Sequence, residues 1–431
     1  MATMVTLVAK QYRNGIPVVF RTASDDFRAE PVSVHAVDGA RSQGLYWTHA
    51  KHPRPKTALL FMHPNVDFTR HYAIPRLLDA GFACLGANTR SPNNDSATVH
   101  EQIILDVQAH VAFLKKQPGI EQVVLVGNSG GGSLMALYQA QAQLPPAQRL
   151  KRTPGGKPLK LSETDLPPAD GIMFLAAHRG EGSVMNSVID PSVVDEANPW
   201  LTDASLDMYA QHNGFREPPA WSEYDAGFIE RYRRGQLERV ARIDRMARAL
   251  IAQTQQMSQR AKEPNHAAMP QDERRDILRS QVFQPIMTVY RTQANLCYAD
   301  ARLDPSAREY GSLMSPRPDV MNFNLIGFGR VTTPQAWLST WSGLSTNADL
   351  VKTGPSITAP ALVVHAERDQ DVFEQADARA ILGALASQDK RLDIVAGARH
   401  YFEPDEPGAD TRALDAAMDV VVDWLAKRFP R

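Results

Sequence analysis

Short apolar segments alternate with helix-like segments in the first 177 residues, and this alternation constrains the fold more than any other feature. Four of the apolar segments are TALLFMH (57–63), FACLGAN (82–88), QVVLVGN (122–128) and GIMFLAA (171–177). Nearly continuous apolar runs of this length are typical of strands that are buried on both faces. Residues 100–119 lie between two of them and place their apolar side chains on one helical stripe. Strands alternating with helices predict an α/β fold, with a mostly parallel sheet flanked by helices.

Two further segments, 32–37 and 44–50, precede these runs and predict a hairpin, so the strand at 171–177 is the sixth. The alternation then stops. Residues 178–360 contain no clear strand–helix–strand unit, and 233–257 has the pattern of a long amphipathic helix. After Pro360 the alternation resumes. We therefore predict a core built from 1–177 and 361–431, with a mostly helical insertion at 178–360.

The composition excludes several classes of function. Among 431 residues, 47 Lys and Arg balance 48 Asp and Glu, which argues against nucleic acid or an anionic membrane as a partner. Two cysteines indicate no disulfide framework, and we find neither a leader pattern at the N-terminus nor a run of ~20 apolar residues. We expect a cytoplasmic protein that acts on a small molecule, and the sequence leaves a homo-oligomer open. The chain has no dinucleotide-binding fingerprint, and its histidines show no metal-ligand spacing, so we expect neither cofactor nor metal.

Ser129 lies between the apolar run 122–128 and a helix-like segment, in the sequence GNSGG (127–131). This matches G-x-S-x-G, in which a serine occupies a sharp strand-to-helix turn and small neighbours allow the turn to close. Such a turn exposes the hydroxyl above the sheet edge. It also directs the amide of the next residue, Gly130, toward an oxyanion that forms on an attacked carbonyl. The motif predicts that Ser129 is a nucleophile.

A nucleophilic serine needs a base and an acid that orients the base. Acidic residues follow the predicted strand 361–366, and His400 follows the predicted strand 391–398. Both sites are at carboxyl ends of strands, the edge at which open α/β sheets place their active sites. The order serine, acid, histidine is the one that this type of sheet requires. Three acids are candidates from the residues alone: Glu367, Asp369 and Asp371.

These segments resemble those of α/β-hydrolases over roughly half of the chain. GNSGGG resembles the nucleophile elbow of that family, HAERDQDV its acid segment and GARHYF its histidine segment. The resemblance implies that Asp369 is the acid. The segment FMHPNVD resembles the family's oxyanion strand end, but proline follows the histidine and has no N–H. The resemblance then implies that the second oxyanion donor is the Asn65 amide. It also implies that the insertion is a lid.

A serine nucleophile favours acyl transfer, and we expect hydrolysis of a carboxylic ester or thioester. Carbon–carbon bond hydrolysis of a diketone, amide hydrolysis and acyl transfer to another acceptor would use the same triad. A non-catalytic binding protein is a further alternative, which an intact set of three residues disfavours.

Four residues are candidates for the substrate pocket. His178 and Arg179 follow the sixth strand, and the arginine is suited to holding a substrate carboxylate or to bracing the lid through Glu181. Trp337 and Trp341 are four residues apart, a spacing that suits an aromatic pocket wall or packing of the lid against the core.

Overall fold

The computed structural model of the chain describes residues 23–94, 96–404 and 411–431. The N-terminal segment in which we looked for a leader lies outside these residues. No helix in the described part is both long enough and apolar enough to cross a membrane.

The core is an eight-stranded sheet with the order β1-β2-β4-β3-β5-β6-β9-β10. The strands are β1 (Phe27–His35), β2 (Arg41–His49), β3 (Thr57–Phe61), β4 (Ala83–Ala87), β5 (Gln122–Asn128), β6 (Gly171–Leu175), β9 (Ala361–Ala366) and β10 (Lys390–Val395). β1 and β2 form the predicted hairpin, β2 pairs antiparallel with β4, and all further pairs are parallel. The mostly parallel sheet predicted from the apolar runs is confirmed.

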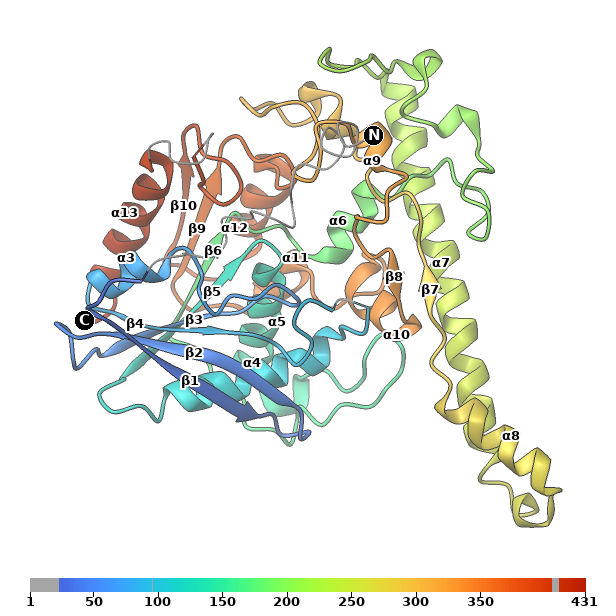
Figure 1. The fold of residues 1–431 in the computed structure, drawn as a ribbon, viewed down its shortest axis with the longest axis horizontal. Coiled ribbons are helices and arrows are strands. Elements are labelled where there is room, and N and C mark those ends of the chain that lie inside the picture. Colours follow the sequence, from blue (N-terminus) through green and yellow to red (C-terminus); the bar gives the residue numbers. More distant parts are fainter. Residues whose placement is uncertain (1–22, 95, 405–410) are drawn as a thin grey trace.

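Helices cover both faces of this sheet (Figure 1). Alternate residues of β5 explain why both faces need cover: Leu125 packs in one core cluster, and Val124 and Val126 pack in the other. The first face is covered by α4 (His100–Leu114), α5 (Gly131–Gln143), α11 (Leu350–Thr353) and α12 (Ala380–Ala384). The second face is covered by α3 (Ile74–Asp79) and α13 (Arg412–Ala426).

The segment between β6 and β9 builds a core of its own. It contains α6 (Glu181–Val188), α7 (Ala226–Arg260), α8 (Gln271–Val282), α9 (Pro318–Met321), α10 (Pro334–Ala336), and the short strands β7 (Met287–Thr288) and β8 (Val331–Thr332). The predicted amphipathic helix is part of α7, which buries Val240, Ile243 and Ala247. Between α6 and α7 the chain has only short 3₁₀ turns and an isolated bridge, so the insertion is less helical than its sequence pattern suggests.

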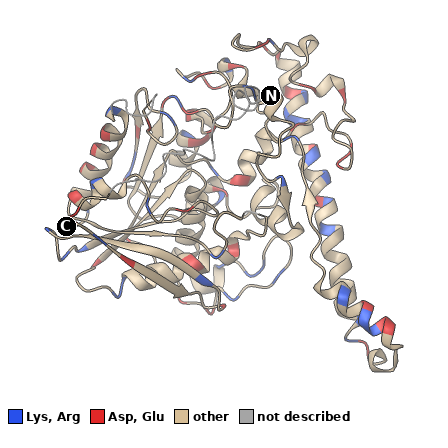
Figure 2. Cartoon of the chain, viewed as in Figure 1, with Lys and Arg blue, Asp and Glu red and all other residues tan. Residues whose placement is uncertain are grey.

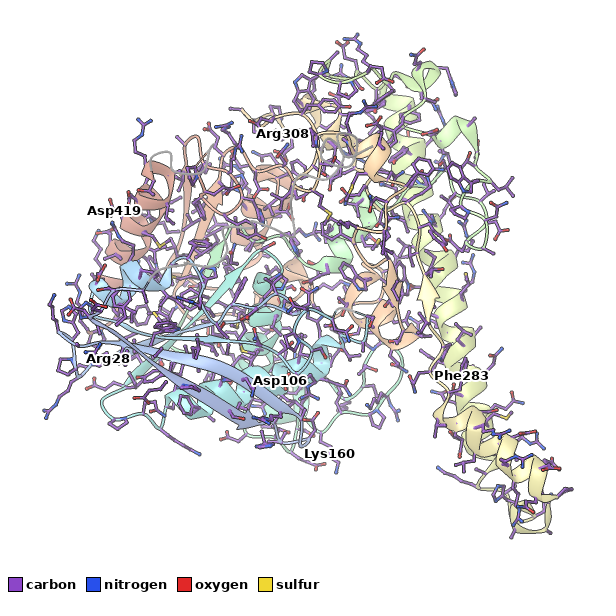
Figure 3. All side chains as sticks on the ribbon, viewed as in Figure 1. Arg28, Asp106, Lys160, Phe283, Arg308 and Asp419 are labelled. Carbon is purple, nitrogen blue, oxygen red and sulfur yellow. The ribbon has the colours of Figure 1, made fainter. Side chains whose placement is uncertain are left out.

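The far half of α7 and all of α8 project from the rest of the molecule as an arm (Figure 1). Phe283, just after α8, lies on this arm with 63 % of its surface exposed (Figure 3). Basic and acidic residues both occur along the arm, as Figure 2 shows. The last part of the insertion behaves differently, because Ala348, Leu350 and Ile357 pack into the core of the sheet.

Candidate active site

Ser129 occupies the turn between β5 and α5 in a left-handed conformation, with φ of +52°. This conformation costs a non-glycine residue roughly 1–3 kcal/mol and is held only where the surroundings enforce it. Here the Ser129 amide donates to Leu175 O of the neighbouring strand β6 at 3.1 Å, and Ser129 O accepts from Gly132 N at 3.1 Å. The turn therefore fixes the serine at the carboxyl edge of the sheet.

The glycines around Ser129 are required because the turn brings backbone against backbone. A Cβ on Gly127 would lie 2.6 Å from Gly132 Cα, and one on Gly131 would lie 2.5 Å from Met62 O. Both distances are far shorter than van der Waals contact. The pattern G-x-S-x-G is thus explained by packing at this turn, as the sequence predicted.

His400 and Asp369 form a buried pair. His400 Nδ1 donates to Asp369 Oδ2 at 2.6 Å, and both residues are 2 % exposed. Asp369 Oδ1 accepts from the amides of Asp371 and Val372 at 2.9 and 3.0 Å. Burial alone would lower the pKa of His400, but the Asp369 carboxylate outweighs it and raises that pKa above its ordinary value. Neither Asp371 nor Glu367 bonds His400: both carboxylate oxygens of Asp371 are buried without a hydrogen bond to the ring, and Glu367 accepts from Gly397 N at 2.8 Å.

The other ring nitrogen of His400, Nε2, is buried without a hydrogen-bond partner among the described residues. It is the atom that would take a proton from a serine hydroxyl. The Ser129 hydroxyl forms no hydrogen bond with it in this structure. Distances of this kind are often long in the absence of substrate and shorten when substrate binds.

Ser129 lines a cavity of about 760 Å³. The core contributes a polar part of the wall, with His63, Asn65, Asn93 and Thr98. The insertion contributes most of the remainder, with His178, Glu181, Val184, Met314, Leu325, Ile326, Gly327, Phe328, Arg330, Val331, Thr340 and Trp341. A cavity of this volume suits a small organic molecule whose apolar portion contacts the insertion.

Ser129 occupies a strained strand-to-helix turn at the carboxyl edge of a mostly parallel sheet. An acid and a histidine that bond each other follow it in the chain. Together these features identify the fold. The chain has the α/β-hydrolase fold. No family model and no curated protein matches the sequence.

Similar solved structures include an α/β-hydrolase from Penicillium sp., 14 % identical, covering 93 % of this chain and 99 % of that one with a TM-score of 0.45. They also include a hypothetical protein from Pseudomonas aeruginosa, 13 % identical, covering 95 % and 96 % with a TM-score of 0.46. A third is an esterase domain from a Rhodothermus marinus protein, 12 % identical, covering 93 % and 99 % with a TM-score of 0.40. At this distance the similarities carry no argument about activity.

The segment after β3 departs from a simple oxyanion loop of the α/β-hydrolase fold. The amides of Asn65 and Val66 donate to His63 Nδ1 at 3.2 and 3.0 Å. The Asn65 N–H therefore points at the His63 ring. Because Nδ1 accepts these bonds, the proton of the neutral His63 ring resides on Nε2. A Cβ on Gly130 would lie 2.9 Å from His63 Nε2, so this donor lies beside the residue that follows the nucleophile.

The four predicted pocket residues divide into two groups. His178 and Trp341 line the cavity. Arg179 and Trp337 do not. The Arg179 side chain forms an ion pair with Asp349 at 3.1 Å, whereas the sequence suggested Glu181 as its partner. Trp337 is fully buried against α7, where its indole N–H donates to Asp244 Oδ1 at 2.7 Å.

Glu181 lines the cavity, although the sequence analysis did not predict it as a member of the pocket. It begins α6 and accepts from Ser133 Oγ at 2.8 Å through Oε2. Its Oε1 has no partner in the described part of the chain. Burial raises its pKa to about 7. Its only sequence signal is its position just after the sixth strand.

The ring of His100 indicates where the proton of Glu181 lies. Thr340 Oγ1 donates to Thr98 O at 2.7 Å, so it accepts from His100 Nδ1 at 3.0 Å. His100 Nε2 then faces Glu181 Oε2 at 3.4 Å with a lone pair. Burial lowers the pKa of His100 to about 3, so the ring is neutral at pH 7. Glu181 is therefore the protonation site of this pair at and below its pKa of about 7.

Burial also lowers the pKa of His63 and of His178 to about 3, so both are neutral imidazoles at pH 7. Within the described residues, no group of three or more His, Cys, Asp or Glu is arranged to hold a metal ion.

Proposed function

We propose that the protein is a serine hydrolase that cleaves a carboxylic ester or thioester through Ser129, His400 and Asp369. The observation that carries this proposal is the combination of a strained Ser129 lining a cavity with the buried His400–Asp369 pair. Glycine would adopt this left-handed turn at lower energetic cost than serine, so the turn itself gives no structural reason for a serine at this position.

In the proposed reaction the Ser129 hydroxyl attacks the substrate carbonyl and its proton passes to His400 Nε2. Asp369 holds the ring with Nδ1–H toward the carboxylate and stabilises the imidazolium. The tetrahedral intermediate collapses when His400 returns the proton to the leaving alcohol or thiol, which leaves an acyl group on Ser129. Water then repeats the sequence, with His400 as its base, and releases the acid.

Stabilisation of the oxyanion needs two donors. The Gly130 amide, at the N-terminus of α5, is the first. For the second, the sequence predicts Asn65 N–H, and the position of His63 Nε2–H beside Gly130 supports the imidazole as a competing candidate. His63→Ala separates them. The rate should fall about 10²–10³-fold if His63 is the donor, and it should hold or rise if Asn65 N–H, released from the ring, is the donor.

We further propose that the insertion acts as a lid that covers the site and selects substrate. In support, most of the cavity wall comes from this segment, and its two ends leave and re-enter the sheet at the adjacent strands β6 and β9. A covering segment excludes water and supplies pocket walls.

The test is a panel of p-nitrophenyl esters of increasing acyl length, assayed beside an anilide and a diketone with wild type and Ser129→Ala. The variant should lose several orders of magnitude in rate and keep its melting temperature. A fluorophosphonate reagent should label wild type once, at Ser129. A variant that keeps most of its rate would refute the nucleophile. Activity on the anilide or the diketone alone would support the proposed triad and would replace the ester as the proposed substrate class.

A further inference from the structure

Arg330 is a buried cation in the wall of the cavity that contains Ser129. It directly precedes β8, lines the cavity and is 8 % exposed. One N–H, from Nη2, donates to Asn322 O at 3.1 Å. Its Nε is buried with no acceptor among the residues that the structure describes, and no carboxylate there lies within ion-pair distance of the guanidinium. A buried guanidinium without an anion is costly, because it gives up hydration and gains no opposite charge.

Glu181, which lines the same cavity, accepts from Ser133 and faces His100 through Oε2, and the carboxylates beside Arg239 and Arg291 are engaged by those arginines. Asp190 pairs with Arg291 at 2.7 Å and accepts from Asn322 Nδ2 at 2.8 Å. Glu196 pairs with Arg239 at 2.8 Å and also with Arg242. Burial is the main reason that the pKa of Arg330 falls to about 10; repulsion from Arg239 and Arg291 adds to it, and Asp190 offsets it in part. The group is still charged at pH 7, and the region has positive charge in excess.

The cavity wall around Arg330 is apolar and fitted to the guanidinium. Leu325, Ile326 and Phe328, which precede Arg330 in the chain, line the same cavity. Gly327 leaves room for the side chain, since a Cβ there would overlap Arg330 Nε. An apolar wall strengthens the attraction between a guanidinium and a bound anion. A single cation in such a wall matches a monoanion, and the planar fork of arginine matches a carboxylate.

We propose that the substrate carries a carboxylate, separate from the bond that is cleaved, which Arg330 binds. This inference rests on the proposed function, because it concerns the substrate of the same cavity. It transfers to Arg330 the role for which the sequence suggested Arg179, whose charge Asp349 neutralises.

The test uses p-nitrophenyl half-esters of linear dicarboxylic acids with a free distal carboxyl, over a range of chain lengths. Each is compared with its neutral analogue, in which a methyl ester replaces that carboxyl. Wild type should prefer the charged ester by roughly 10–100-fold in kcat/KM at the best length, the range expected for a hydrogen bond to a charged group. Arg330→Gln should abolish the preference by raising KM for the charged ester, so that the kcat/KM values of the charged and neutral esters converge.

Two further variants serve as controls for the charge and for the position of the Arg330 side chain. Arg234→Gln removes a charge of the same sign from α7, at a side chain that is 59 % exposed, and should leave the preference unchanged. Gly327→Ala pushes a methyl group against Arg330 Nε and keeps the charge, and it should reduce the preference.

Arg330→Gln should also hold or raise the melting temperature, because it removes an unpaired buried cation. A lower melting temperature, with both esters slowed equally, would assign Arg330 a structural role and overturn the proposal.

Direct binding separates this inference from the proposed function. Calorimetry of a free half-ester with Ser129→Ala needs no turnover. Binding that Arg330→Gln abolishes in this background supports the carboxylate subsite even if no ester is hydrolysed. Conversely, Ser129-dependent hydrolysis of charged and neutral esters at equal rates, unaffected by Arg330→Gln, would overturn the subsite and leave the hydrolase proposal intact.

Discussion

The two carboxylate oxygens of Asp369 have different partners, and this division predicts how its substitution behaves. Oδ2 accepts from His400 and Oδ1 accepts from two backbone amides. In Asp369→Asn, an N–H at the Oδ1 position would face two backbone N–H donors, so the amide turns its N–H toward His400. A donor at this position favours the wrong imidazole tautomer. The rate should fall about 10⁴-fold by analogy with a studied triad. Asp371→Asn should cost less than tenfold in steady-state assays, and the reverse pattern would reassign the acid.

The raised pKa of His400 sets the direction of the pH dependence. The base must be neutral to accept the serine proton, so kcat/KM should rise with pH through the pKa of His400. Asp369 holds that pKa above the ordinary value of about 6.5, so the midpoint of the acidic limb should lie above it. Substitution of Asp369 by Asn should move the limb to lower pH.

Glu181, with a pKa of about 7, titrates in the same pH range as His400. A limb that vanishes in Glu181→Gln would therefore belong to Glu181.

At the scale of elements, the predictions succeeded where one local pattern determines the structure. The run 122–128 followed by GNSGG predicts a strand, a turn and a helix, and β5, Ser129 and α5 follow it. The pairing of His63 Nδ1 with Asn65 N depends on the path of a loop, and no residue pattern encodes it. Glu181 and Arg330 are single charged residues whose burial follows from packing between distant segments, so sequence reasoning could not place them in the cavity.

The turn from Trp337 to Trp341 shows how one element can serve two tasks. It is a π-helical turn, with Ser342 N donating to Trp337 O at 2.8 Å. Trp337 packs against α7, so Trp337→Ala should destabilise the protein by about 3–5 kcal/mol. Trp341 lines the cavity, so Trp341→Ala should change the ratio of kcat/KM for long and short esters. Thermal melts and this ratio, measured on both variants, check the division. A ratio at the wild-type value for Trp341→Ala would make it a packing residue.

At the scale of the whole molecule, the sheet and the insertion each contain one buried free cysteine. Cys84 belongs to a core cluster of the sheet, and Cys297 belongs to the core of the insertion. Burial raises the pKa of both thiols, to about 11 for Cys297, so neither should react quickly in the native protein. Because Cys84 and Cys297 belong to separate core clusters, they should become labelled by iodoacetamide at different urea concentrations. Peptide mass spectrometry assigns each site, and coincident midpoints would mean that both parts unfold together.

The chain leaves the sheet after β6 and returns in β9, and these strands are hydrogen-bonded neighbours, with Ile172 opposite Ala361. The part of the insertion before Ala348 can therefore be lengthened, shortened or exchanged while the strands stay in register, whereas Ala348, Leu350 and Ile357 must be kept because they pack into the core of the sheet. Such a junction separates two evolutionary tasks. The proposed reactive groups lie on loops of the sheet and most of the cavity wall lies in the insertion, so one contiguous stretch of gene encodes most of the pocket. A chimaera in which the part of the insertion before Ala348 comes from another protein of the α/β-hydrolase fold would be a direct trial of that modularity.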